Sequence, residues 1–77
     1  MVIGKVLSRS ERVFDRRDGT RVHLVSYDIG WLGGSLRVEH WDPPRLYAVG
    51  ESVMLPVTLR WLKQGEQIRL FGTVREP

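Results

Sequence analysis

Arginine and aromatic side chains recur at alternate positions in two stretches of the sequence. In residues 21–27 and again in residues 37–41, a cation and a flat ring share one parity. Side chains two residues apart on a β-strand point to the same side, so each stretch would place its cation and its ring on one surface. Bases of a single strand stack on such rings while arginines follow the phosphates, and each stacked base contributes about 1–3 kcal/mol. The pattern therefore favours a surface for single-stranded DNA or RNA.

The apolar residues of these two stretches are the expected core side. Val22 and Leu24 alternate with the polar set in the first stretch, and Leu36 and Val38 do so in the second. If they face inward, the opposite surface carries the following side chains: Arg21, His23, Tyr27, Arg37 and Trp41. The alternative is that the rings pack at the rim of a small core or in a dimer interface.

Two turns flank this surface in the expected fold. The first follows Phe14 and carries Arg16 and Arg17, and the second is bounded by Arg60, Trp61 and Lys63. Either turn alone would be a solvated hairpin tip, but both bring cations and a ring, which predicts two arms around one face. The predicted nucleic-acid-binding residues are then Phe14, Arg16, Arg17, Arg21, Tyr27, Arg37, Trp41, Arg60 and Lys63. Phe14, Tyr27 and Trp41 would stack on bases, and the cations would contact phosphates.

Catalysis and metal binding have weaker support. His23 and His40 are the candidates for a base that titrates near neutral pH. A set of Ser35, His40 and Asp42 lacks a nucleophile elbow and a glycine-rich oxyanion loop. His23, His40 and Asp42 could hold zinc, but their spacing is not diagnostic, and His40 shares the parity of its apolar neighbours. We expect no enzymatic activity, no cofactor, no metal and no small-molecule substrate.

Composition limits the class of protein further. The 77 residues suffice for one domain, and the absence of cysteine excludes disulfides and a cysteine-based zinc site. The net charge is +3, and ten of the twelve basic residues are arginine, which binds phosphate in a bidentate way and stacks on rings. A GC-rich genome would produce the same bias. Interspersed acidic residues disfavour tight binding to a duplex, which needs a strong basic patch.

Neither a membrane segment nor a signal peptide is visible. No apolar stretch approaches the roughly 18 residues of a membrane helix, and the start has no charged lead before an apolar run. We expect a soluble, cytoplasmic protein that does not contact a membrane.

Alternation at period two, interrupted by glycine and proline, predicts an all-β fold. Five antiparallel strands are expected at residues 2–13, 20–29, 35–41, 52–61 and 68–74. Asp18-Gly19 is expected to form a type I′ turn, and Pro56 should leave part of its strand with a free edge. In the last two strands the inward set is Val53, Leu55, Val57, Leu59, Trp61, Ile68, Leu70, Gly72 and Val74. The outward set of the last strand is Arg69, Phe71, Thr73 and Arg75.

Two small barrels match this element order. The long first strand and the meander of the first three strands favour a five-stranded OB-fold-like barrel, so residues 1–77 are expected to form a single OB-like β-barrel domain. The alternative is an SH3-like barrel.

With these elements in place, the chain resembles the small single-stranded-DNA-binding proteins of filamentous phages and related mobile elements. The likeness is one of layout and rests on three segments: "RRDGTRVHLVSYDI" (16–29), "YAVGESVMLPV" (47–57) and "GEQIRLFG" (65–72). The resemblance implies an OB-type chain that pairs as a homodimer or higher oligomer and coats single strands. It also implies that Arg16, Arg17 and Arg21 belong to a basic DNA-binding loop and strand. The short "GWLGG" turn departs from the longer hairpin usual in those proteins.

The sequence therefore predicts a module that binds single-stranded DNA or RNA without sequence specificity. The alternative is a β-barrel adaptor or oligomerisation domain that binds protein through the same exposed rings. Acidic residues between the arginines, or rings buried between subunits, would favour that alternative.

Overall fold

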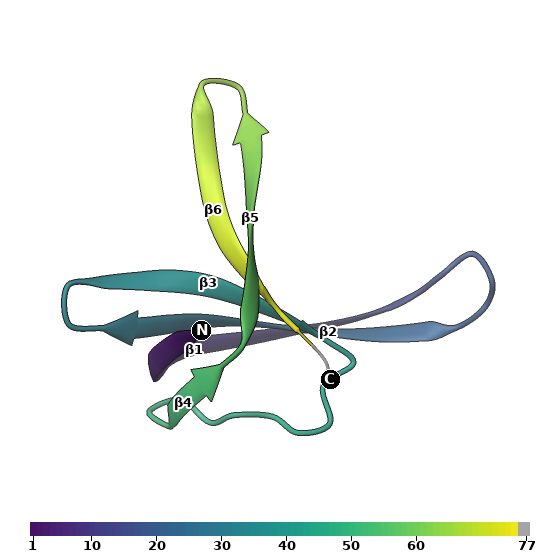
Figure 1. The fold of residues 1–77 in the computed structure, drawn as a ribbon. Helices are drawn as coiled ribbons and strands as arrows, with labels where there is room; N and C mark the ends of the chain where they lie inside the picture. The colour runs from purple at the N-terminus through teal and green to yellow at the C-terminus, as the bar shows by residue number, and fades with distance from the viewer. Residues whose placement is uncertain (76–77) are drawn as a thin grey trace.

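The structure, a computed structural model, describes residues 1–75. The strands of this part of the chain form one β-sheet (Figure 1). In that part of the chain the strands are β1 (Val2–Asp15), β2 (Arg21–Trp31), β3 (Gly34–Trp41), β4 (Ser52–Leu55), β5 (Val57–Gln64) and β6 (Gln67–Val74). Their order in the sheet is β4-β1-β2-β3-β6-β5. The all-β prediction is confirmed. Across the described residues, no helix is long and apolar enough to cross a membrane.

The first three strands form the predicted antiparallel meander, whereas β3 and β6 run parallel. The prediction that all strands pair antiparallel is therefore wrong, and the sheet is mixed. The parallel pair arises because the chain leaves β3, crosses through β4 and β5, and returns in β6 beside β3 in the same direction. This pairing brings Phe71 level with Arg37.

The strand expected at residues 52–61 is divided at Pro56. Residues before the proline pair with β1, and residues after it pair with β6. Pro56 has no amide hydrogen to continue a ladder, although its carbonyl accepts the amide hydrogen of Arg75 at 2.9 Å. The two edges of the sheet, β4 and β5, are thus successive pieces of chain joined at one residue. The sheet is not closed, so the expectation of a closed barrel is not met.

The turn between β1 and β2 differs from the predicted type I′ turn. The Gly19 amide donates to the Arg16 carbonyl at 3.0 Å, so Arg17 and Asp18 are the central residues. Gly19 has a φ of 86°, whereas Asp18 does not have a positive φ. This is the geometry of a type I turn followed by a left-handed glycine. Asp18 Oδ1 accepts the Thr20 hydroxyl at 2.7 Å and the Thr20 amide at 3.0 Å, and these hydrogen bonds lower the pKa of Asp18.

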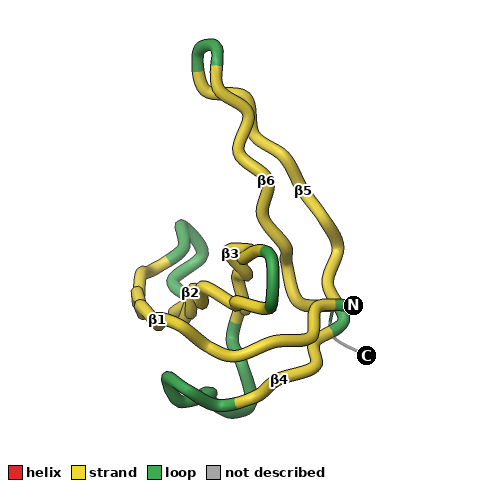
Figure 2. Tube along the Cα trace, turned by 90° about the vertical axis from the view of Figure 1, so that its left-hand side faces the viewer, coloured by secondary structure: helices red, strands yellow, loops and turns green. Residues whose placement is uncertain are grey.

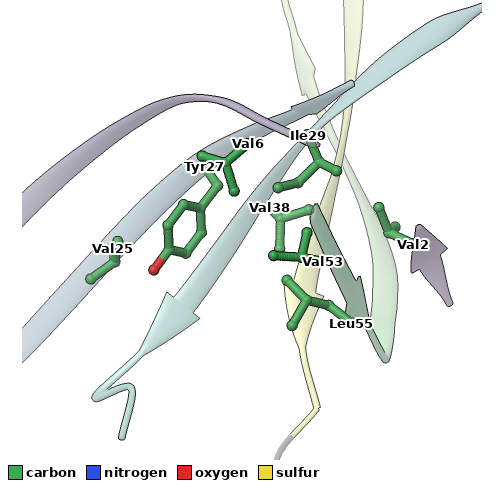
Figure 3. Packing of buried hydrophobic residues seen from close by; sticks show 8 residues of the cluster. All are labelled: Val2, Val6, Val25, Tyr27, Ile29, Val38, Val53 and Leu55. Atoms are coloured by element: carbon green, nitrogen blue, oxygen red, sulfur yellow. The ribbon is translucent and has the colours of Figure 1, made fainter. Parts of the chain in front are cut away.

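The hydrophobic core lies on one side of the meander, between β1, β2, β3 and β4. Figure 3 shows its eight buried residues, which are Val2, Val6, Val25, Tyr27, Ile29, Val38, Val53 and Leu55. The register explains this set, because Val6 pairs with Ile29 and Tyr27 with Val38, and paired residues share a face. The core side of β2 is therefore the Val25/Tyr27/Ile29 side.

The loop 42–51 covers this core beside Tyr27. The Tyr47 amide donates to the Tyr27 hydroxyl at 3.2 Å, and the two rings meet at 5.7 Å between centroids. Arg9 donates to the Tyr47 carbonyl at 3.0 Å, and the Arg45 guanidinium lies 4.6 Å from the Tyr47 ring centroid. Gly50 and Glu51 exchange backbone hydrogen bonds with Val6. The loop is thus fixed to β1 on one side and to Tyr27 on the other.

Two hairpins project from the core in different directions (Figure 1), and the dimensions of the molecule are 42 × 34 × 23 Å. One consists of the distal parts of β1 and β2. The other is the β5–β6 hairpin, which stands away from the rest of the molecule in Figure 2. Residues 58–70 of the β5–β6 hairpin are therefore exposed on both of its sides.

Gly4 is required where β1 passes the end of β2. A β-carbon at this position would clash with the Gly30 carbonyl oxygen and lie 3.0 Å from Cγ2 of Ile29. We expect Gly4→Ala to lower the free energy of unfolding by about 1–3 kcal/mol, because an added methyl group in a packed site forces the backbone to shift. Urea denaturation followed by circular dichroism measures this effect. The neighbouring exposed change Lys5→Ala should stay within about 0.5 kcal/mol of the wild type, and equal losses for the two variants would contradict the packing argument.

Candidate nucleic-acid interface

The side of the meander opposite the core is an exposed surface that we call the outer face. Its members follow from the register: Leu24 pairs with Trp41, Ser26 with Glu39, and Asp28 with Arg37. β1 extends this surface on one side, because its residues pair with the outer-face residues of β2. The β5–β6 hairpin extends it on the other side, because Phe71 of β6 pairs with Arg37. The further side chains of the outer face are Ser8, Ser10, Arg12, Phe14, Val22, Arg60, Leu62, Arg69 and Phe71.

A pair of aromatic rings lies at one end of the outer face. Phe14 and Trp41 meet edge to face, with 5.9 Å between centroids and 86° between planes. Each ring is 38% exposed. Their cross-strand partners Val22 and Leu24 are buried but do not belong to the core cluster. The rings thus cover a small apolar cluster and still present surface to solvent.

Asp42 holds the end of β3, and with it Trp41, against β2. Its amide donates to the His23 carbonyl at 2.7 Å, and its Oδ1 accepts the His23 amide at 2.9 Å. Asp42 has a φ of 46°, which aspartate tolerates better than most side chains do. This double hydrogen bond fixes the backbone next to the Trp41 ring.

Two hollows lie on the outer face, one over the meander and one between β3 and the β5–β6 hairpin. One hollow of about 350 Å³ is lined by Ser10, Arg12, Leu24, Ser26, Arg37 and Glu39. A second hollow of about 380 Å³ is lined by Arg37, Glu39, Leu62, Gln64, Arg69, Leu70 and Phe71. Arg37 and Glu39 border both hollows, so the two are adjacent. We call the two hollows together the outer-face groove.

The charges in this groove are mixed. Arg37 Nε lies 3.4 Å from Asp28 Oδ1, and the Ser8 hydroxyl donates to Asp28 Oδ2 at 2.6 Å. An exposed ion pair of this kind contributes at most about 1 kcal/mol, so an incoming phosphate can replace Asp28 as a partner of Arg37. Asp28 and Glu39 nevertheless weaken the positive potential along the groove.

Four of the sequence-predicted residues meet on the outer face. Phe14 and Trp41 form the ring pair, Arg37 lies in the middle of the groove, and Arg60 pairs with Phe71 on the hairpin. The predicted sidedness of Arg37 and Trp41 is therefore correct. Phe71 and Arg69 match their predicted outward orientation.

Tyr27 does not belong to this surface, and the prediction that it is exposed is wrong. Its side chain is 0% exposed and lies in the core. The error came from assigning the Val22/Leu24 side of β2 to the core. The register places Leu24 beside Trp41 on the outer face and Tyr27 beside Val38. A base cannot stack on Tyr27 in this fold.

The remaining predicted cations lie away from the groove. Arg21 is on the other side of β2, where its Nε is 3.2 Å from Asp15 Oδ1. Lys63 pairs with Ile68, and this pair shares the apolar side of the hairpin with Trp61. Arg16 and Arg17 are exposed at the β1–β2 turn, which points in a different direction from the β5–β6 turn (Figure 1). The two turns therefore do not close around one surface in this structure.

Three groove residues were not predicted as binding candidates from the sequence, namely Arg12, Arg69 and Phe71. Alternation already predicted that Arg69 and Phe71 face outward. The missing information was that β6 pairs with β3, which makes the two outer surfaces continuous. For Arg12, the signal was its position level with Leu24 on the neighbouring strand.

The two histidines lie away from the outer-face groove. Within residues 1–75, no three His, Asp or Glu side chains lie close enough together to hold a metal ion. His40 is buried on the core side, and His23 Nε2 lies 3.0 Å from Glu11 Oε1 on the face opposite the groove.

Comparison of the chain with protein-family models, curated proteins and solved structures finds no match.

Proposed function

We propose that the protein binds single-stranded DNA or RNA along the outer-face groove, with little sequence preference and without catalysis. The observation that carries this proposal is the outer-face groove, whose two adjacent hollows contain Arg12, Arg37 and Arg69. Leu24 in the first hollow pairs with Trp41, and Phe71 lines the second hollow beside Arg37. Phosphates would bind the guanidinium groups, while bases would stack on Trp41 and Phe71.

The mixed charge supports a single strand in preference to a duplex. Asp28 and Glu39 lie among the arginines of the groove, so few phosphates can be neutralised together. A duplex binder depends on many such contacts, whereas a binder of unpaired bases gains most of its affinity from stacking. The half-exposed Trp41 and Phe71 rings supply that contribution.

We also propose that the fold is of the OB type. With β4 and β5 taken as halves of one interrupted strand, the sheet has five strands, and its two edges belong to that same strand. This arrangement brings both edges together at Pro56, as a barrel requires. In an OB barrel the second and third strands form the ligand-binding face, which supports the outer sides of β2 and β3 as the centre of the site. A cytoplasmic location fits this role and is part of the proposal.

A protein-binding role is the second candidate. It is favoured by the acidic residues between the arginines, because Asp28 and Glu39 could pair with basic residues of a peptide. Such a ligand would bind the same groove without any preference for nucleic acid.

Titration of the protein with a fluorescent oligo-dT strand and with duplex DNA, followed by anisotropy, tests the proposal. We expect the single strand to bind more tightly than the duplex. If about four arginines contact phosphates, the logarithm of affinity should fall with the logarithm of salt at a slope of about −3, which is a loss of about 50-fold between 50 and 200 mM. The substitution Arg37→Gln should weaken binding about tenfold, because it removes a charge-assisted hydrogen bond to phosphate.

Arg21→Gln is the matched control for Arg37→Gln. Each arginine is exposed, lies on β2 or β3 and pairs with an aspartate, but only Arg37 faces the groove. Equal losses for the two variants would show that general charge, rather than the groove, attracts the strand. Binding that does not respond to salt, or no binding of oligo-dT at all, would favour the protein-binding role.

A further inference from the structure

The β5–β6 hairpin has one apolar side that is exposed to solvent. On this side Leu59, Trp61, Ile68 and Leu70 are 59%, 69%, 65% and 56% exposed. Trp61 pairs with Leu70, and Leu59 with Gly72, so these side chains form one stripe along both strands. The opposite side of the hairpin is mostly polar: it carries Leu62 and Phe71 among Thr58, Arg60, Gln64, Gln67 and Arg69. Such alternation is typical of a sheet with one face in water and the other against protein.

The apolar stripe continues the hydrophobic core. At the base of the hairpin, Val57 and Val74 pack against the core cluster on the same side. Further along, Leu59, Trp61, Ile68 and Leu70 are each more than half exposed, because the hairpin stands away from the rest of the molecule (Figure 2). The apolar alternation of β5 and β6 thus continues past Val57 and Val74 into residues that a single protomer leaves exposed.

A matching apolar hollow opens at the base of the same hairpin. Its volume is about 420 Å³, and it is lined by Met1, Val2, Trp31, Ser35, Leu36, Val57, Leu59 and Leu70. Seven of these eight residues are apolar. The hollow lies at the open end of the core, between the β2–β3 end of the sheet and the hairpin. An apolar side chain of another molecule can insert into this hollow next to Leu36.

The exposed area is sufficient for a dimer. The chain exposes 5802 Å², whereas a compact monomer of 8.9 kDa is expected to expose about 4,800 Å². The excess is thus about a fifth, and a standard interface needs about 800 Å² from each partner. The projecting stripe and the hollow belong to one chain, so two copies can exchange them reciprocally about a two-fold axis.

We infer that the β5–β6 hairpin is a dimerisation arm, which packs its apolar stripe against the stripe and the hollow of a second copy of the chain. Trp61 and Ile68 are the central contacts, because they lie farthest from their own core and are the most exposed members of the stripe. This inference does not depend on nucleic-acid binding, since it concerns the other side of the hairpin.

Sedimentation equilibrium of the wild type and two variants tests this inference. The wild type should sediment at twice the 8.9 kDa protomer mass. The double change Trp61→Thr with Ile68→Thr keeps residues that favour strands and removes the centre of the stripe. It should weaken dimerisation by about 30-fold or more, as removal of a central interface residue does. Leu62→Thr, one residue away on the polar side, is the matched control and should leave the dimer unchanged.

Two outcomes would overturn the inference: a wild type that stays monomeric at high micromolar concentration, or a dimer that survives the double change. A second measurement covers the case in which the double variant does not fold. Isotope-filtered NOE spectra of a mixture of labelled and unlabelled wild-type protein should show contacts from the Trp61 ring to methyl groups of Leu36 or Leu59 in the other copy. A dimer without such contacts would place the interface elsewhere and contradict the assignment.

Discussion

Tyr27→Ala is expected to lower the free energy of unfolding by about 3–5 kcal/mol, as truncation of a large buried ring does. Tyr27 is fully buried, belongs to the core cluster and contacts the Tyr47 ring. A loss of this size is a large part of the 5–15 kcal/mol or so that stabilises a typical domain, and small domains lie near the lower end. Thermal and urea denaturation, followed by circular dichroism, measure it.

Tyr27→Phe is the control for this prediction. It keeps the ring and removes the hydroxyl that accepts the Tyr47 amide hydrogen at 3.2 Å, so it should cost about 1 kcal/mol. If Tyr27→Ala were as stable as the wild type, the ring would not be a core element, and its exclusion from the binding surface would no longer hold. A loss of oligonucleotide binding in Tyr27→Ala would report unfolding and not lost stacking.

Trp41→Ala is expected to weaken the binding of oligo-dT by about tenfold or more, because one stacked base contributes about 1–3 kcal/mol. The ring lies on the outer face at the end of the groove, with its edge-to-face partner Phe14. Asp42 fixes the adjacent backbone through its two hydrogen bonds with His23, so the backbone that carries the ring is held in place before a base arrives. Fluorescence anisotropy at low salt measures the change.

The control for Trp41→Ala must separate stacking from stability, since the ring also borders the buried Leu24. Trp41→Phe keeps a flat ring and should retain most of the affinity. A melting curve of each variant shows whether the fraction folded is the same at the temperature of the titration. Unchanged affinity in a folded Trp41→Ala protein would remove the ring from the site and leave the arginines as a non-specific anion surface.

The outcome at Tyr27 and Trp41 shows how far alternation alone can define a surface. Alternation correctly grouped Tyr27 with Val25, and Trp41 with Arg37. It could not say which group of β2 lies on the same side as which group of β3. A shift of register by one residue moves every side chain to the other face, and β2 carries large apolar residues on both sides. Only the pairing of Leu24 with Trp41 decides that Tyr27 belongs inside.

The β5–β6 hairpin shows a different limit. Its alternation correctly identified which side chains share the apolar side, but the prediction that all of them face inward is wrong. The distal half of that side is exposed in the protomer, because alternation reports that a strand has an apolar side and not what covers it. The apolar side of a strand can be buried by the same chain or by another copy. Which of the two buries it depends on where the hairpin lies in space.

The sequence by itself determined that the chain is all-β, where its glycines and prolines end the strands, and which residues of each strand share a side. These are local properties, since they follow from backbone conformations and from the period of two along a strand. The tertiary structure alone decided the register of β2 on β3, the parallel pairing of β3 with β6, and the division of one strand at Pro56 between the two edges of the sheet. Those features depend on contacts between residues far apart in the chain, and through them Arg12, Arg37, Arg69, Trp41 and Phe71 share one face.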